Sequence, residues 1–182
     1  MTREARRYRL AAAGCVAAIY ASAYPVQFVL DFLRAHNLLR LSIAAIGLAA
    51  IGLAVALLAR RRAGAREWVV LALIALAYLA VASRLEIVQE RIHLVEYGVV
   101  ALLVRRSLEP PGGGGEARAS AAAFSVTALA GLGDELLQGV LPNRHFDWRD
   151  VRLNAISGAL ALVAAIVLAA ARSATPERAG GA

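Results

Sequence analysis

Three short stretches of this sequence place ionisable side chains within or against long apolar runs. They are Glu86–Tyr97, Asp134–Gln138 and Arg144–Asn154. A charged side chain at the centre of a lipid bilayer costs about 2.5–3.5 kcal/mol on insertion scales. Because of this cost, an ionisable residue retained in a membrane segment indicates a functional site.

The first stretch predicts one polar face on an otherwise apolar helix. The residues on this face are Glu86, Glu90, His93 and Tyr97, with Glu96 at its edge. At about 100° per residue, the first four fall within about 60° of one another. An imidazole beside carboxylates can transfer protons near neutral pH. The simpler interpretation is a wet helix end at the membrane interface, but a histidine and two acids on one face favour a site.

The second stretch places two adjacent acids, Asp134 and Glu135, inside an apolar segment. Asp134 and Gln138 are one helical turn apart and therefore share a face. Acids at this depth must be paired or neutralised, because an isolated charge in lipid is far costlier than a paired one. We therefore expect their partners in the other two stretches, with His93, Glu135 and Arg144 in one pocket.

The third stretch has an arginine ahead of a helix that begins with acids. Asp147, Asp150 and Asn154 are spaced i, i+3 and i+7, so they form one stripe at the start of the last helix. Arg144 lies in the preceding turn, and its planar guanidinium suits a phosphate or carboxylate. For Asp147 alone, capping of the helix N-terminus is the simpler interpretation.

These residue types divide into three candidate roles. Proton transfer is assigned to His93, Glu90 and Glu135; anion or head-group binding to Arg144, Gln138, Tyr97 and Asn154; and a hard divalent cation to Asp134, Asp147 and Asp150. No strict metal motif such as H-E-x-x-H is present, so the cofactor stays open between a divalent cation and none.

The apolar runs predict the elements that position these groups. Of the 182 residues 60% are hydrophobic, and a helix needs roughly 20 apolar residues to cross a bilayer. A continuous helix over 68–104 is too long for one crossing, so we expect a tight hairpin near Arg84. The fold class is therefore all-α, a polytopic transmembrane bundle of about six helices. The expected spans are 9–32, 38–59, 68–84, 86–104, 119–141 and 151–171.

The chain divides into two helical parts and a tail. Residues 1–83 hold three helices, residues 84–172 hold the other three and the polar stretches, and residues 173–182 are expected to be disordered. A flexible Pro- and Gly-rich loop is expected at 107–118. The start of the chain resembles a signal peptide, but apolar residues resume directly after Ala23, which favours a retained first helix.

The net charge of +7 comes entirely from arginine, since the sequence has no lysine. Most arginines lie at the ends of apolar runs, where they set topology and contact head groups. No basic stripe with interleaved aromatic residues is present, which argues against nucleic acid as a partner. The one cysteine, Cys15, excludes an internal disulfide and a multi-cysteine metal site. The oligomeric state is left open.

The polar stretches also carry a resemblance to a known family. The sequence reads E-R-I-H-L-V-E-Y-G at 90–98, D-E-L-L-Q at 134–138 and P-N-R-H-F-D-W-R-D at 142–150. This pattern resembles the VanZ-like family over about residues 84–165. The family's closing N-x-x-G element is one residue longer here, N-A-I-S-G at 154–158. The resemblance implies a bacterial cell-membrane protein of a family named for low-level teicoplanin resistance, and it supplies no reaction mechanism.

Three functions are compatible with these residues. The first is an enzyme that acts on an envelope lipid or a lipid-linked precursor. The second is a non-catalytic module that binds a lipid or a glycopeptide, or that supports a partner complex. A small transporter is less favoured, because the acids gather on one side of the membrane and the two halves show no repeat. The expected partner is a membrane lipid or a lipid-linked precursor.

The arginines are distributed unequally between the two ends of the expected helices. Thirteen lie in the segments 3–9, 60–66, 105–118 and 172–178, and six lie at the opposite ends. The positive-inside rule therefore places both termini in the cytoplasm of a bacterial inner-membrane protein. With this orientation, all three polar stretches lie at the outer face.

We predict that reporter fusions after Arg106 and after Arg178 will both be cytoplasmic. The reason is the arginine excess in short loops, where the positive-inside rule is most reliable. Paired alkaline phosphatase and fluorescent protein fusions measure this directly. An external reading at either position would contradict the topology and the shared outer position of the polar stretches.

Overall fold

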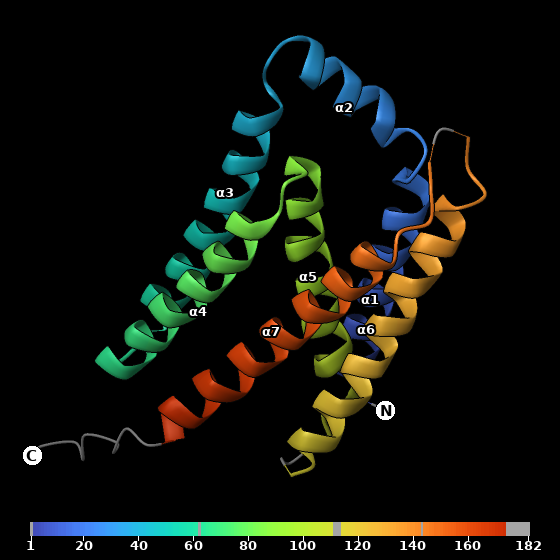
Figure 1. Ribbon diagram of the computed structural model, residues 1–182. Helices are drawn as coiled ribbons and strands as arrows, with labels where there is room; N and C mark the ends of the chain where they lie inside the picture. Colours follow the sequence, from blue (N-terminus) through green and yellow to red (C-terminus); the bar gives the residue numbers. More distant parts are fainter. Residues whose placement is uncertain (1, 62, 111–113, 143, 174–182) are drawn as a thin grey trace, which may run out of the picture.

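The computed structural model describes residues 2–61, 63–110, 114–142 and 144–173, and within these ranges all regular structure is helical (Figure 1). The fold class expected from the sequence is therefore confirmed. The elements are α1 (Arg3–Ser22), α2 (Val26–Ala35), α3 (Leu39–Arg60), α4 (Ala65–Arg84), the 3₁₀ turn η1 (Val88–Glu90), α5 (Arg91–Leu108), α6 (Glu116–Gln138) and α7 (Trp148–Ser173).

Three of the described helices are long and apolar enough to cross a membrane, namely α3, α4 and α7. The pair α1 and α2 passes the same test together and counts as a fourth candidate. The expected number of about six spans is therefore approximate. Helices α5 and α6 are not among these candidates, and both contain charged residues of the polar stretches.

The first expected helix, 9–32, is broken. The axes of α1 and α2 meet at 61°, and the break falls between Ser22 and Val26. Pro25 explains it, because proline has no backbone N–H and its ring clashes with the preceding turn of a helix. The break leaves the backbone carbonyl of Ala23 available to a side chain from elsewhere in the chain.

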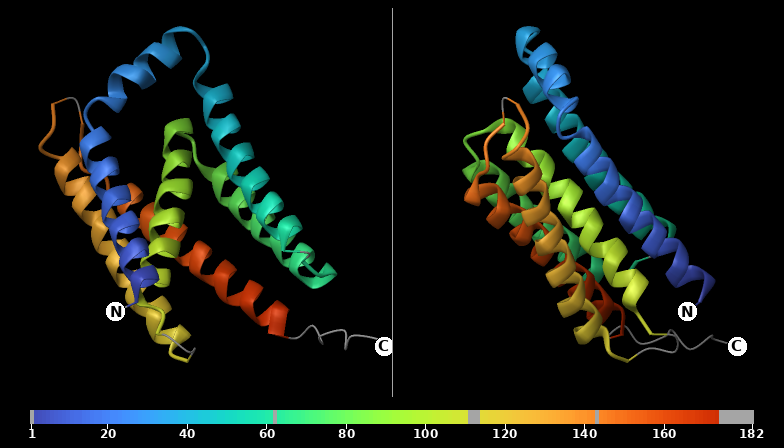
Figure 2. Two further views of the ribbon diagram at one scale, coloured as in Figure 1. Left: turned by 180° about the vertical axis from the view of Figure 1, so that it is seen from behind. Right: turned by 90° about the vertical axis from the view of Figure 1, so that its right-hand side faces the viewer.

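The chain turns between α4 and α5, as the sequence predicted, and it reverses direction there (Figures 1 and 2). The fourth helix was expected to start at residue 86 but begins at Arg91. Leu85 is extended, and its carbonyl accepts a hydrogen bond of 3.3 Å from the Arg91 guanidinium. Glu86 therefore lies outside the helix and is exposed, so its predicted place on the polar face is wrong.

The ends of the last two helices are also shifted from the expected ones. The structure places α6 at 116–138 rather than 119–141, and α7 begins at 148 rather than 151. Gly139 and Pro142 follow the end of α6, where they do not support a further turn. The expected loop at 107–118 includes residues 111–113, and the expected disorder of the tail concerns 174–182; both fall outside the described residues.

Helix α5 lies at the centre and packs against α1, α6 and α7 (Figures 1 and 2). Its residues Tyr97, Val100 and Ala101 have no exposed surface. Small residues bring the helices together, as is common between membrane helices. At Gly131 of α6, for example, an added Cβ would lie 2.7 Å from the Cβ of Asn154 in α7.

The helix ends fall into two groups (Figures 1 and 2). The start of α1, the end of α3, the start of α4 and the end of α7 lie at one end of the bundle. The start of α5, the end of α6 and the segment joining α6 to α7 lie toward the other end, with α2. The three polar stretches are thus gathered at one end of the bundle.

Replacing Gly131 with alanine should lower the free energy of unfolding by about 1–3 kcal/mol, because the new Cβ meets a Cβ that cannot rotate away. The matched control is Gly52→Ala in α3, where nothing lies within 4 Å. Both changes share the intrinsic gain of alanine over glycine in a helix. Thermal unfolding in one detergent compares them, and equal unfolding temperatures would contradict the close contact.

Candidate functional site

The polar residues of three helices meet in one cluster. His93 of α5, Glu135 of α6 and Asp150 of α7 each offer a ligand atom, and these atoms lie within 4.8 Å of one another. The predicted approach of His93 and Glu135 is therefore confirmed, although 42 residues of sequence separate them. We call these three residues the central cluster.

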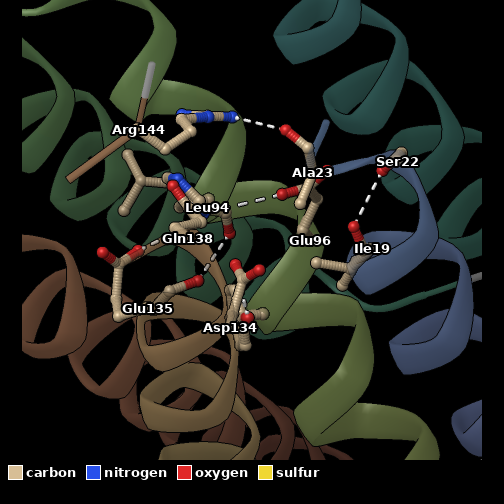
Figure 3. A network of polar contacts seen from close by, with 12 residues as sticks. Ile19, Ser22, Ala23, Leu94, Glu96, Asp134, Glu135, Gln138 and Arg144 are labelled. Atoms are coloured by element: carbon tan, nitrogen blue, oxygen red, sulfur yellow. Dashed lines mark hydrogen bonds and ion pairs between the residues drawn. The ribbon is translucent and has the colours of Figure 1, made fainter. Parts of the chain in front are cut away.

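Glu135 is the member of the central cluster whose carboxylate accepts two hydrogen bonds from the protein. Its side chain has no exposed surface. The Gln138 side-chain amide donates to its Oε1 at 3.1 Å, and the backbone N–H of Asp147 donates to its Oε2 at 3.2 Å. Figure 3 shows Glu135 and Gln138 side by side on α6. Each carboxylate oxygen keeps a second lone pair, so Glu135 can accept a further donor or bind a cation.

Asp134, the neighbour of Glu135, faces a different partner. The Tyr97 hydroxyl donates to its Oδ2 at 3.0 Å, and both side chains are almost completely buried. Its Oδ1 has no hydrogen-bond partner among the described residues. The structure thus places Tyr97, expected to bind a head group, against an acid of the protein. Its proposed binding role stays a prediction.

His93 lies between carboxylates. Its Nδ1 is 3.6 Å from Oε2 of Glu96, one turn along α5, and its side chain is 16% exposed. Oδ1 of Asp150, another member of the central cluster, is buried and has no hydrogen-bond partner in the part of the chain described. Glu96 received no role from the sequence, although its i, i+3 spacing from the histidine was the signal that could have identified it.

The Arg144 side chain contacts the backbone at the break between α1 and α2. Its Nη2 donates to the Ala23 carbonyl at 3.2 Å, as Figure 3 shows. The Gln27 side-chain amide also lies against this guanidinium; with its oxygen turned toward the arginine, it accepts from Nη2 at 2.8 Å. The sequence could not indicate Ala23 and Gln27, because the contact depends on a backbone break more than 100 residues away.

A small cavity of about 60 Å³ separates Arg144 from the acids of the site. Polar and apolar side chains line it together, and they come from α1, α2, α5, α6 and the segment before α7. The polar lining residues are Ser22, His93, Glu96, Asp134, Gln138 and Arg144. This cavity contains groups from all three polar stretches.

Three predicted site residues, Asp134, Asp147 and Asn154, lie outside the central cluster. Oδ1 of Asp147 accepts from the backbone N–H of Arg149 at 2.7 Å, so this acid caps α7 as the simpler interpretation stated. Asn154 is fully buried against Gly131, and both of its amide atoms lack a hydrogen-bond partner among the described residues. Neither Asp134 nor Asp147 belongs to the central cluster; of the expected cation ligands, only Asp150 does.

Glu90, expected to transfer protons, lies beside the central cluster in η1. Its carboxylate is 3.9 Å from Nη2 of Arg149. Burial raises the pKa of Glu90, and the nearby Asp150 carboxylate raises it further, while Arg149 opposes both effects. Glu90 thus retains a proton to higher pH than an exposed glutamate does.

An open groove of about 550 Å³ lies between α4 and α7 and leads to the central cluster. Its apolar lining comes from Ala80, Val81, Leu85, Leu153 and Ile156, and its charged lining from Arg84, Glu90, Arg149, Asp150 and Arg152. Asp150 belongs to both the groove and the central cluster. A molecule in the groove would therefore contact apolar wall, arginine and the central cluster at once.

A family model described as VanZ/LLP1 matches residues 17–169. The chain belongs to the VanZ-like family. The match includes the end of α1 and all of α2, α3 and α4, so the family extends well beyond the 84–165 region in which the sequence motifs lie. No curated protein and no solved structure matches the chain.

Proposed function

We propose that this VanZ-like protein is a membrane enzyme that acts on the phosphate-bearing head group of an envelope lipid or lipid-linked precursor. The observation that carries the proposal is the central cluster, in which an imidazole and two carboxylates from three helices approach within 4.8 Å. Such sets of groups can activate an attacking water or transfer protons. The cluster is better suited to a reaction than to binding alone.

The groove supports an amphiphilic substrate. Its apolar residues match an acyl or isoprenoid chain, and Arg84, Arg149 and Arg152 match a phosphate, with which guanidinium groups form strong paired hydrogen bonds. Chain and head group would then lie at different points along one path. The head group would reach the central cluster through Asp150.

Arg144 supplies a further positive charge on the opposite side of the site. Some of its N–H groups are used by the Ala23 carbonyl and the Gln27 side-chain oxygen, and a guanidinium has five. The remaining donors can stabilise negative charge that develops on a phosphate oxygen during reaction. This role also needs the planar geometry, since the guanidinium must satisfy Ala23 and the substrate together.

In the cell, the proposed setting is the bacterial inner membrane, with both termini in the cytoplasm and the site at the outer face. The arginine distribution supports this orientation. Processing of an envelope lipid there would alter the surface that glycopeptides meet. Low-level teicoplanin resistance would then be a consequence of the reaction rather than the reaction itself.

We predict that His93→Gln will abolish turnover and retain lipid binding. Glutamine keeps the approximate size and polarity but cannot act as the imidazole does, and acid–base groups contribute about 10²–10⁴-fold to rates. Protein in nanodiscs is incubated with an envelope-lipid extract, and products are followed by mass spectrometry; binding is measured with fluorescent phosphatidylglycerol. The matched control is His145→Gln, an exposed histidine before α7.

Two outcomes would contradict this proposal, the first against an enzyme and the second against the central cluster as its reactive centre. If the unmodified protein binds the lipids but changes none of them, it is a non-catalytic lipid- or antibiotic-binding module. If His93→Gln and His145→Gln both turn over lipid at the original rate, the central cluster is not the reactive centre.

We also predict that Arg144→Lys will remove function at normal membrane abundance. Lysine keeps the charge but loses the planar donors that contact Ala23 and Gln27 and that would hold a phosphate. The measurement is complementation of a deletion strain, scored by glycopeptide tolerance and envelope integrity. Arg34→Lys, an exposed pair with Asp31, is the control. Full complementation by Arg144→Lys would contradict a specific anion contact.

A further inference from the structure

We propose that the central cluster binds one divalent transition-metal ion, with Zn²⁺ the best match and Mn²⁺ the next. Protein ligands of Zn²⁺ lie about 2.0–2.2 Å from the ion, so in tetrahedral geometry two ligand atoms lie about 3.4 Å apart. The ligand atoms of His93, Glu135 and Asp150 already lie within 4.8 Å of one another. Side-chain shifts on the order of an ångström would therefore bring them to binding distance.

The surroundings of the ligands resemble the outer shell of a metal site. Ligating carboxylates and histidines are usually held by further hydrogen bonds, often with a carboxylate beside the histidine. Here Glu135 accepts from Gln138 and from the Asp147 backbone, and Glu96 lies 3.6 Å from the His93 ring. The two hydrogen bonds fix the orientation of Glu135 before an ion binds, and Glu96 places a carboxylate beside the histidine.

The charge balance of the cluster also favours a cation. Among the described residues neither Glu135 nor Asp150 forms an ion pair with an arginine, because Arg144 is directed to the Ala23 carbonyl and Arg149 to Glu90. The Oδ1 atom of Asp150 is buried without a hydrogen-bond partner in the same part of the chain. A buried carboxylate oxygen without a partner is costly, and a bound cation would satisfy it.

The ligand set discriminates between ions. Imidazole together with carboxylates suits Zn²⁺ and Mn²⁺, whereas Ca²⁺ takes six to eight oxygen ligands and Mg²⁺ is usually held by one or two carboxylates and several waters. Three protein ligands also leave a position for water or a substrate oxygen. A bound Zn²⁺ would supply an activated water near neutral pH. This inference uses the site of the proposed enzyme, but ion binding is measurable without turnover.

The test is equilibrium dialysis of the full chain, purified without a histidine tag and stripped with a chelator. ZnCl₂ and MnCl₂ should each load about one ion per chain, and MgCl₂ and CaCl₂ should not compete at equal concentration. Asp150→Asn should weaken Zn²⁺ binding on the order of 100-fold, since even outer-shell changes cost 10–100-fold. His145→Gln should bind as the unmodified protein does. Substoichiometric loading, or equal affinity of Asp150→Asn, would overturn the proposal.

A second measurement avoids changing the cluster at all. The chain has three histidines, so the double variant His36→Gln/His145→Gln retains only His93. Pulsed electron paramagnetic resonance of its bound Mn²⁺ should show an imidazole nitrogen, and absence of that signal would overturn the assignment of His93 as a ligand. One ion per chain with no lipid turnover would leave the metal site standing and reject the enzyme. Lipid turnover by a protein that loads no ion in dialysis would reject the metal site alone.

Discussion

A carboxylate buried inside a helical bundle has to be hydrogen-bonded, paired or neutralised, and α6 carries two of them in succession. Asp134 and Glu135 point to different neighbours and therefore tie α6 to different elements. Asp134 is bound by Tyr97 of α5, and Glu135 by the backbone at the entry of α7. The positions of α5, α6 and α7 at this end of the bundle depend on satisfying these two acids.

The break between α1 and α2 connects the first part of the chain to the same site. A continuous helix would use the Ala23 carbonyl in its own backbone ladder. Because Pro25 interrupts the helix, Ala23 accepts from Arg144 instead, and Gln27 lies against the same guanidinium. The family match beginning at residue 17 agrees with a site that includes this break.

The sequence predicted those features that depend on local pattern. The all-helical class, the turn between α4 and α5 and the approach of His93 to Glu135 all follow from apolar run length and the cost of buried charge. The sequence did not predict features in which contacts between distant segments determine the local backbone or the partner of a side chain. The 3₁₀ turn before Arg91 is closed by an arginine side chain, and the roles of Ala23 and Gln27 depend on a distant loop. Spacing alone also could not tell that Asp147 caps α7 while Asp150, one turn on, enters the central cluster.

Asp147 and Asp150 belong to one predicted stripe but have different neighbours: Asp147 caps α7, and Asp150 lies in both the groove and the central cluster. Asp147 is used at the helix start, where its carboxylate satisfies a backbone donor of the first turn and its own N–H holds Glu135. Asp150 is then presented between the groove of α4 and α7 and the cluster behind it. A head group arriving along the arginines of the groove would therefore meet Asp150 before His93 or Glu135. Any ion held by all three residues would lie at the point where the apolar path ends and the buried charges begin.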